Sequence, residues 1–150
     1  MTTFKYLDQT KKQLQEDTER KKLAELLRKN DIDPNGVFYK LHNQWVVTHR
    51  GLERLAMALN IKFDLPIILE SDSQNFSVAL LVKGKLDDKE EWTIGEANIK
   101  NIKIPFPYAI AEKRAKDRII LKLLGAHGFV YSDSEIEGAK DGDLSWHWNR

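Results

Sequence analysis

The sequence contains no cysteine, which excludes a disulfide framework and a metal site built on thiolates. It also lacks a long apolar run, because the longest stretches, near residues 66–69 and 78–82, are far too short to cross a bilayer. The opening residues MTTFKYLDQTKK have no apolar centre of the kind found in secretory signals. These absences predict a soluble, cytoplasmic protein with no membrane association.

Motifs for enzyme chemistry are absent as well. The chain has no glycine-rich phosphate loop, no GxSxG motif and no HExxH motif. Its four histidines show no metal-ligand spacing (His42, His49, His127 and His147). We therefore predict a protein that is not an enzyme and uses no metal or cofactor. One alternative stays open, a metal-dependent nuclease built from Asp64, Glu70 and Lys83, which Mg²⁺-dependent cleavage of DNA would reveal.

Charge is balanced over the whole chain but not along it. With 24 Lys and Arg against 23 Asp and Glu, the chain is not a polycation of the histone type. Residues 61–97 hold four Lys and eight acids, a net charge of −4, and residues 98–131 hold seven Lys or Arg and two acids, a net charge of +5. Residues 132–150 hold five acids and two cations. The sequence thus predicts a cationic surface confined to residues 98–131.

Length and pattern predict one α+β domain with a tail, since 41% apolar residues in a chain of 150 suffice for a core. The strand segments are Lys62–Glu70 (interrupted at Pro66), Asn75–Lys83 and Lys89–Ala97. Short polar links between them predict an antiparallel three-stranded meander. A long helix from Tyr108, ending near Gly125, follows and should pack on the sheet. We assign this β-β-β-α core to residues 36–131.

Additional elements flank the core strands. Residues 1–35 should form an N-terminal helix over 8–29, with Asp8 as its N-cap, and a loop over 30–36. A hairpin–helix insertion should comprise strands 37–41 and 44–48, a turn at His42-Asn43, and a helix over 49–59 capped by Thr48. Residues 132–150 are predicted to be an acidic, mobile tail.

The predicted helix after Tyr108 is amphipathic. An apolar stripe at three- and four-residue steps should face the sheet (Tyr108, Ala111, Ala115, Ile119 and Leu123). Two ion pairs are expected on its outer surface, Glu112 with Lys116 and Lys113 with Asp117.

Three further cations on this helix, Arg114, Arg118 and Lys122, repeat at four-residue steps along one edge of the stripe. We call them the basic row. No acidic residue of the helix stands four residues from any of them, and only Asp117 could reach Arg114. One interpretation is a solvated face, or a face neutralised by acids of the strands. The other is a track for the phosphates of a nucleic acid.

The strand–strand–strand–helix order, the sequence Gly95-Glu96-Ala97 and the helix sequence AEKRAKDRIILKLLG (residues 111–125) resemble the single-strand annealing proteins of phages and eukaryotes, the Erf, Sak and Rad-fifty-two superfamily. The likeness spans roughly residues 36–131. In that family a β-β-β-α core forms oligomeric rings or arcs and holds single-stranded DNA in a basic groove. The resemblance implies backbone contacts from Arg118 and Lys122, with Arg114 and Lys113 as weaker matches.

We therefore predict binding and annealing of single-stranded DNA in homologous recombination or repair, by a homo-oligomer in the form of a ring, arc or filament. The predicted DNA-binding residues are Lys100, Lys103, Lys113, Arg114, Arg118 and Lys122. The predicted stacking residues are Tyr108 and Phe106, with Trp45 as a further candidate. The main alternative is a non-catalytic protein-interaction or assembly module. It would use the N-terminal helix and a tail that carries Trp146 and Trp148, and it predicts no nucleic-acid binding even at low salt.

Overall fold

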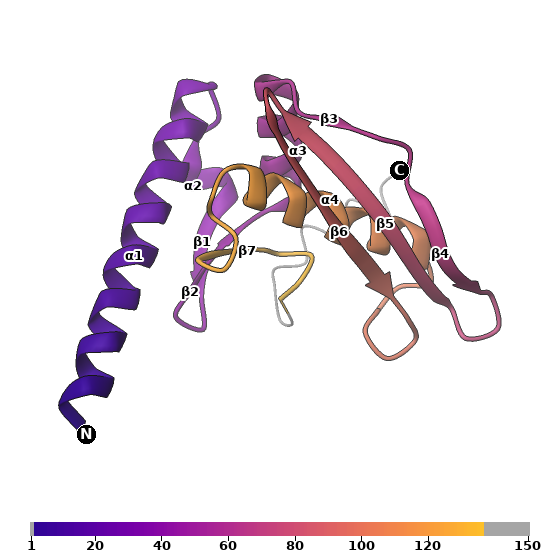
Figure 1. The fold of residues 1–150 in the computed structure, drawn as a ribbon, viewed down its shortest axis with the longest axis horizontal. Coiled ribbons are helices and arrows are strands. Elements are labelled where there is room, and N and C mark those ends of the chain that lie inside the picture. Colours follow the sequence, from indigo (N-terminus) through magenta and orange to yellow (C-terminus); the bar gives the residue numbers. More distant parts are fainter. Residues whose placement is uncertain (1, 137–150) are drawn as a thin grey trace.

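The computed structural model describes residues 2–136, with side chains from residue 9 onward, and confirms the predicted α+β class (Figure 1). The helices are α1 (Thr2–Lys29), α2 (Pro34–Val37), α3 (His49–Leu59) and α4 (Pro107–Leu123). The strands are β1 (Phe38–Leu41), β2 (Gln44–Val47), β3 (Lys62–Phe63), β4 (Ile67–Asp72), β5 (Ser77–Leu86), β6 (Lys89–Ala97) and β7 (Val130–Ser132). Figure 1 shows α1 on one side, the long strands on the other, and α4 between them.

The predicted meander is present as β4, β5 and β6, and both strand pairs are antiparallel. Strand β5 is central because it pairs with β6 on one side and with both β3 and β4 on the other. Pro66 separates β3 from β4, as the sequence predicts, since proline cannot donate to a strand ladder. Alternate residues of β5 are buried (Val78, Leu80, Val82 and Gly84). The sheet therefore has one face packed on the core and one face open.

Helix α4 covers the buried face of this sheet. Four of the five residues of the predicted stripe are fully buried (Ala111, Ala115, Ile119 and Leu123). The fifth, Tyr108, is 45% exposed, and its hydroxyl is hydrogen-bonded to that of Ser71 on β4, so its assignment to the stripe is wrong. Contact with the sheet is close because Gly95 has no side chain. A Cβ there would lie 2.2 Å from the Ala111 carbonyl oxygen and 2.7 Å from the Ala115 Cβ.

The hairpin and helix between α1 and the meander agree with the sequence. Strands β1 and β2 pair antiparallel around His42 and Asn43, which both have positive φ as a two-residue turn of type I′ requires. The Thr48 hydroxyl accepts a hydrogen bond from the Gly51 amide and caps α3. Strand β7, which the sequence did not predict, pairs in parallel with β2. Its last residue, Ser132, is the first residue of the predicted tail, most of which (residues 137–150) lies outside the described residues.

The N-terminal region differs from prediction at two boundaries. Helix α1 begins at Thr2, so Asp8 lies within it and is not its N-cap. The predicted loop contains the short helix α2, capped by the Asp33 side chain, with Pro34 in its first turn. Leu23 and Leu27 of α1 are buried in the same core cluster as the α4 stripe. Among the described residues, no helix has the length and apolar character that crossing a membrane requires.

Candidate nucleic-acid interface

The basic row lies along the free edge of β6. Among the described strands β6 pairs only with β5, so the carbonyl groups on its other edge have no strand partner. The row supplies one donor to every second residue of that edge. Lys122 Nζ donates to the Trp92 carbonyl (3.2 Å), Arg118 Nη1 to Ile94 (2.7 Å) and Arg114 Nη1 to Glu96 (2.9 Å).

Helix and strand geometry explains this match. Four residues of an α-helix rise about 6.0 Å and two residues of a strand advance about 6.8 Å, so the two repeats stay nearly in step over three contacts. An uncovered strand edge invites pairing with another chain. The basic row therefore covers the edge with side-chain donors, and this is a structural function that the sequence did not reveal.

The row has partners within the chain, but most of them are carbonyl groups and not the strand acids that one interpretation expected. Arg114 also donates to the side chain and the carbonyl of Asn101 (3.0 and 2.6 Å) and, through Nε, to the Ser134 carbonyl (3.0 Å). Arg118 Nε donates to the Glu135 carboxylate. Most of these acceptors are neutral carbonyls, and within residues 9–136 only Glu135 brings a carboxylate onto the row. Within residues 9–136 the row is therefore held in place mainly by neutral groups, and the carboxylate of Glu135 offsets only part of its charge.

Donors remain on two members of the row. A guanidinium has five N–H donors and an ammonium has three. Within the described part of the chain, Arg118 uses two in the bonds above and Lys122 uses one. Burial lowers the pKa of Arg114, and the nearby charges of Glu135 and Arg118 shift it in opposite directions. A guanidinium nevertheless stays protonated in proteins, so Arg114 carries its charge at neutral pH.

The remaining predicted cations fall into two groups. Lys100 and Lys103 are exposed on the loop between β6 and α4, the same loop that Asn101 fastens to Arg114, so they extend the row. Lys113 is only 5% exposed, which argues against its assignment as a DNA contact. Its expected place on the outer surface beside Asp117 is wrong for the same reason. The other expected pair, Lys116 with Glu112, is confirmed at 2.6 Å.

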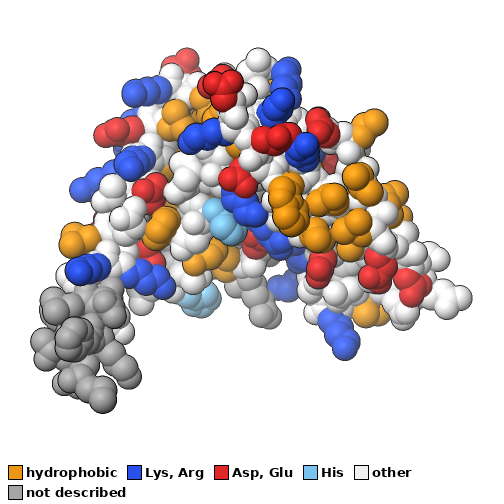
Figure 2. Space-filling view, viewed as in Figure 1, with side chains coloured by type: hydrophobic (Ala, Val, Ile, Leu, Met, Phe, Trp, Pro, Cys, Tyr) orange, Lys and Arg blue, Asp and Glu red, His pale blue; other side chains and the backbone are white. Residues whose placement is uncertain are grey.

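Aromatic side chains lie toward both ends of this interface. Phe106 is 44% exposed at the start of α4. Trp92, whose carbonyl receives Lys122, is 60% exposed, and sequence reasoning did not select it. Residues of a strand point alternately to its two faces, and Thr93 and Gly95 point to the buried face. This alternation could have indicated that Trp92 is exposed. Figure 2 shows a band of Lys and Arg side chains running beside the apolar surface of the long strands.

Trp45 is a weaker stacking candidate than the sequence suggests. Its ring already contacts three side chains of the same chain. The Arg20 guanidinium lies 4.8 Å and the Lys40 ammonium 5.7 Å from the ring centroid, and Phe38 packs edge-on at 5.4 Å. These contacts fasten α1 to the β1–β2 hairpin.

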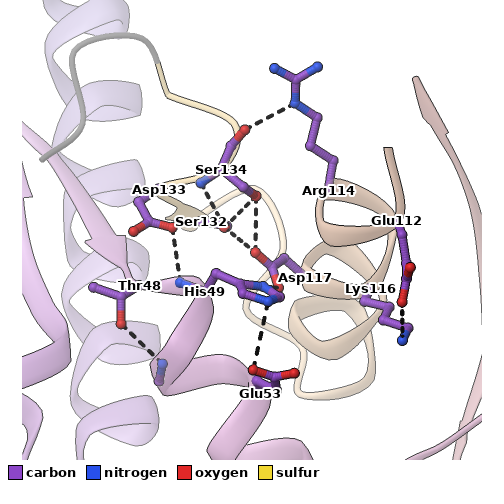
Figure 3. Close-up of polar contacts among 11 residues, drawn as sticks. Thr48, His49, Glu53, Glu112, Arg114, Lys116, Asp117, Ser132, Asp133 and Ser134 are labelled. Carbon is purple, nitrogen blue, oxygen red and sulfur yellow. Dashed lines mark hydrogen bonds and ion pairs between the residues drawn. The ribbon is translucent and has the colours of Figure 1, made fainter. Parts of the chain in front are cut away.

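A buried polar cluster around Asp117 lies beside the row on α4, and Ser134 contacts both Asp117 and Arg114 (Figure 3). The carboxylate of Asp117 is fully buried and accepts hydrogen bonds from the Ser132 and Ser134 hydroxyls, the latter at 3.0 Å. His49 Nδ1 lies 2.7 Å from its other oxygen, and His49 Nε2 lies 3.9 Å from the Glu53 carboxylate. One carboxylate thus joins α3, α4 and the segment after β7.

This cluster makes stability depend on pH. Burial alone would lower the pKa of His49, but the hydrogen bond and the charge of Asp117 outweigh it and raise the pKa above its ordinary value. A raised pKa contributes stability that is complete below about pH 6.5 and is lost as pH rises through the folded-state pKa. We expect urea unfolding to show this loss as pH rises above about 6.5, the ordinary pKa of histidine, and His49→Gln to remove it. His127→Gln is the control, because the pKa of His127 is lowered by burial and by Lys122, and its contribution runs in the opposite direction.

No group of three or more His, Cys, Asp or Glu side chains that could hold a metal ion occurs within residues 9–136. Lys83 is one of the three residues of the alternative nuclease site, with Asp64 and Glu70. Its Nζ lies 2.8 Å from a carboxylate oxygen of Glu90, and the hydrogen bond and charge of Glu90 raise the pKa of Lys83.

Comparison with known proteins gave no match. No protein-family model matches the chain, and no curated protein or solved structure matches it.

Proposed function

We propose that this protein binds single-stranded DNA along the basic row and anneals complementary strands, acting in the cytoplasm as a homo-oligomer. The observation that carries the proposal is the row itself: Arg114, Arg118 and Lys122 form a straight line of charge whose partners are mostly neutral carbonyls. Spaced cations bind a polyanion by releasing its counterions, and a charge held by carbonyl groups stays available for that exchange.

The surroundings of the row fit a single strand better than a duplex. The row extends over eight residue steps of α4, from Arg114 to Lys122, or about 12 Å, and the loop with Lys100 and Lys103 lengthens it. The half-exposed rings of Trp92 and Phe106 offer faces on which unpaired bases can stack. Annealing requires no bond chemistry, only a strand held by its phosphates with its bases readable. The resemblance to the single-strand annealing proteins points to the same activity.

The test is a pair of matched double variants. Arg118→Ala with Lys122→Ala removes two cations of the row, and Lys62→Ala with Lys116→Ala removes two cations near β3, at the edge of the sheet away from β6, where Lys116 pairs with Glu112 and lies 5.4 Å from the Phe63 ring. We expect the first variant to bind all single-stranded sequences more weakly. Its salt dependence, the slope of log K against log salt, should flatten by about 1.4, which corresponds to two phosphate contacts.

The control variant should keep the affinity and slope of the unaltered chain. Circular dichroism and thermal unfolding must accompany the measurement, because Arg118 and Lys122 also cover the edge of β6. If a folded row variant keeps the original affinity and slope, the row does not bind DNA.

A second candidate function is supported by the other edge of the sheet. Strand β4 and the turn before it expose consecutive apolar side chains (Leu65, Ile67, Ile68 and Leu69). A contiguous exposed apolar surface marks a protein interface more often than a nucleic-acid site. A protein-interaction module would use this surface, and it predicts no binding of single-stranded DNA even at low salt.

A further inference from the structure

The segment that follows β7 lies across the basic row. The Ser134 carbonyl accepts a hydrogen bond from Arg114 Nε at 3.0 Å, and the Glu135 carboxylate accepts one from Arg118 Nε. The pair is partly enclosed, with 29% of the Arg118 side chain and 19% of the Glu135 side chain exposed. Two of the three cations of the row therefore contact this segment.

The segment is also fastened to α4, β2 and α3 by contacts beside the row. The Ser132 and Ser134 hydroxyls both bond to the buried carboxylate of Asp117. The Asp133 amide donates to the Val47 carbonyl at 3.0 Å, and the Asp133 carboxylate accepts from the His49 amide at 2.9 Å. Glu135 comes after these contacts, and its amide bonds to the Ser132 carbonyl at 3.1 Å. The hydrogen bonds of residues 132–134 therefore hold the Glu135 side chain in position beside Arg118.

We propose that residues 132–135 form an internal competitor for the basic row, in which the Glu135 carboxylate occupies the place on Arg118 that a DNA phosphate would take. This inference rests on the proposed function. A carboxylate and a phosphate use the same donors of a guanidinium, so one must leave before the other binds there. DNA must therefore displace Glu135, and the apparent affinity is reduced by the fraction of molecules in which Arg118 is covered.

The size of the effect follows from the exposure of the pair. A single, partly exposed ion pair of this kind changes an equilibrium by about threefold to fivefold. Competition of this strength tunes DNA binding without abolishing it. If Glu135 competes with DNA, its removal should strengthen binding. If Glu135 only held the row in place, its removal should weaken binding.

The experiment compares Glu135→Gln with Glu112→Gln in the full chain. Both changes raise the net charge by one unit and preserve side-chain size, but Glu112 pairs with Lys116 at 2.6 Å and has no contact with the row in the described residues. The probe is a fluorescent oligothymidine, titrated at two salt concentrations. We expect Glu135→Gln to bind about threefold to fivefold more tightly than Glu112→Gln, with a salt slope steeper by about 0.7, or one phosphate contact.

A second readout follows the segment directly. Hydrogen exchange of the amides in residues 132–136 of the unaltered chain should become faster when the oligonucleotide binds, because the segment is displaced. Equal affinities of the two variants, or slower exchange in this segment, would overturn the inference while DNA binding itself stands. Absence of binding by the unaltered chain and both variants would overturn the proposed function and the competitor with it. Binding by Glu135→Gln alone would support both.

Discussion

Replacing Gly95 with alanine should separate helix α4 from strand β6. The added methyl group would lie 2.2 Å from the backbone oxygen of Ala111 and 2.7 Å from the Ala115 Cβ. A backbone atom cannot rotate away as the end of a side chain can, so the helix or the strand must move. We expect a loss of about 3 kcal/mol in the free energy of unfolding and a fall of about 6 to 12 °C in melting temperature.

Urea and thermal unfolding measure this effect. The control is Gly36→Ala, since a Cβ at Gly36 would meet nothing within 4 Å. It should change the free energy of unfolding by no more than about 0.5 kcal/mol. If both variants unfold at the same urea concentration, α4 does not pack on β6 as closely as the structure has it.

Replacing Asp117 with alanine should have the largest effect in the polar cluster. Its carboxylate is fully buried, and its removal leaves the Ser132 hydroxyl and a ring nitrogen of His49 without their acceptor. Breaking a buried charged pair by removing one partner costs about 3 to 5 kcal/mol. Asp117→Asn should lose less, because the amide keeps the shape and one acceptor oxygen.

Urea unfolding at pH 6 compares these variants with Glu25→Ala, a change at an exposed acid of α1. The Glu25 variant should unfold within about 0.5 kcal/mol of the unaltered chain. An Asp117→Ala protein as stable as this control would contradict the assignment of Asp117 as the residue that joins α3, α4 and the segment after β7.

The strands and helices were predictable because their signals are local. Alternation at period two along β5 and β6 and the apolar stripe of α4 reflect which side faces the core, and both patterns are written in neighbouring residues. Strand β7 has no such pattern, since it spans only Val130–Ser132 and pairs with a strand more than 80 residues earlier in the chain. The position of Asp8 was misread because a residue of good capping type also occurs inside a long charged helix.

The candidate site was less predictable than the fold. The spacing of the basic row could be read from the sequence, but its partners are mostly backbone carbonyls of β6. Every residue type has a backbone carbonyl, so the sequence contains no pattern that would indicate these contacts. Asp117 and Lys113 look like a surface ion pair at a four-residue step, yet both are buried, because the segment after β7 and helix α3 cover that face. In both cases the missing information is a contact between segments distant in the chain.

The most direct test of the proposed function is binding of the full chain to a fluorescent single-stranded oligonucleotide at two salt concentrations, with a duplex of matched length beside it. We predict tighter binding to the single strand, and a loss of affinity at higher salt that reflects the cations of the basic row. No binding at low salt, or equal binding of strand and duplex, would contradict it. The row would then serve only to cover the edge of β6.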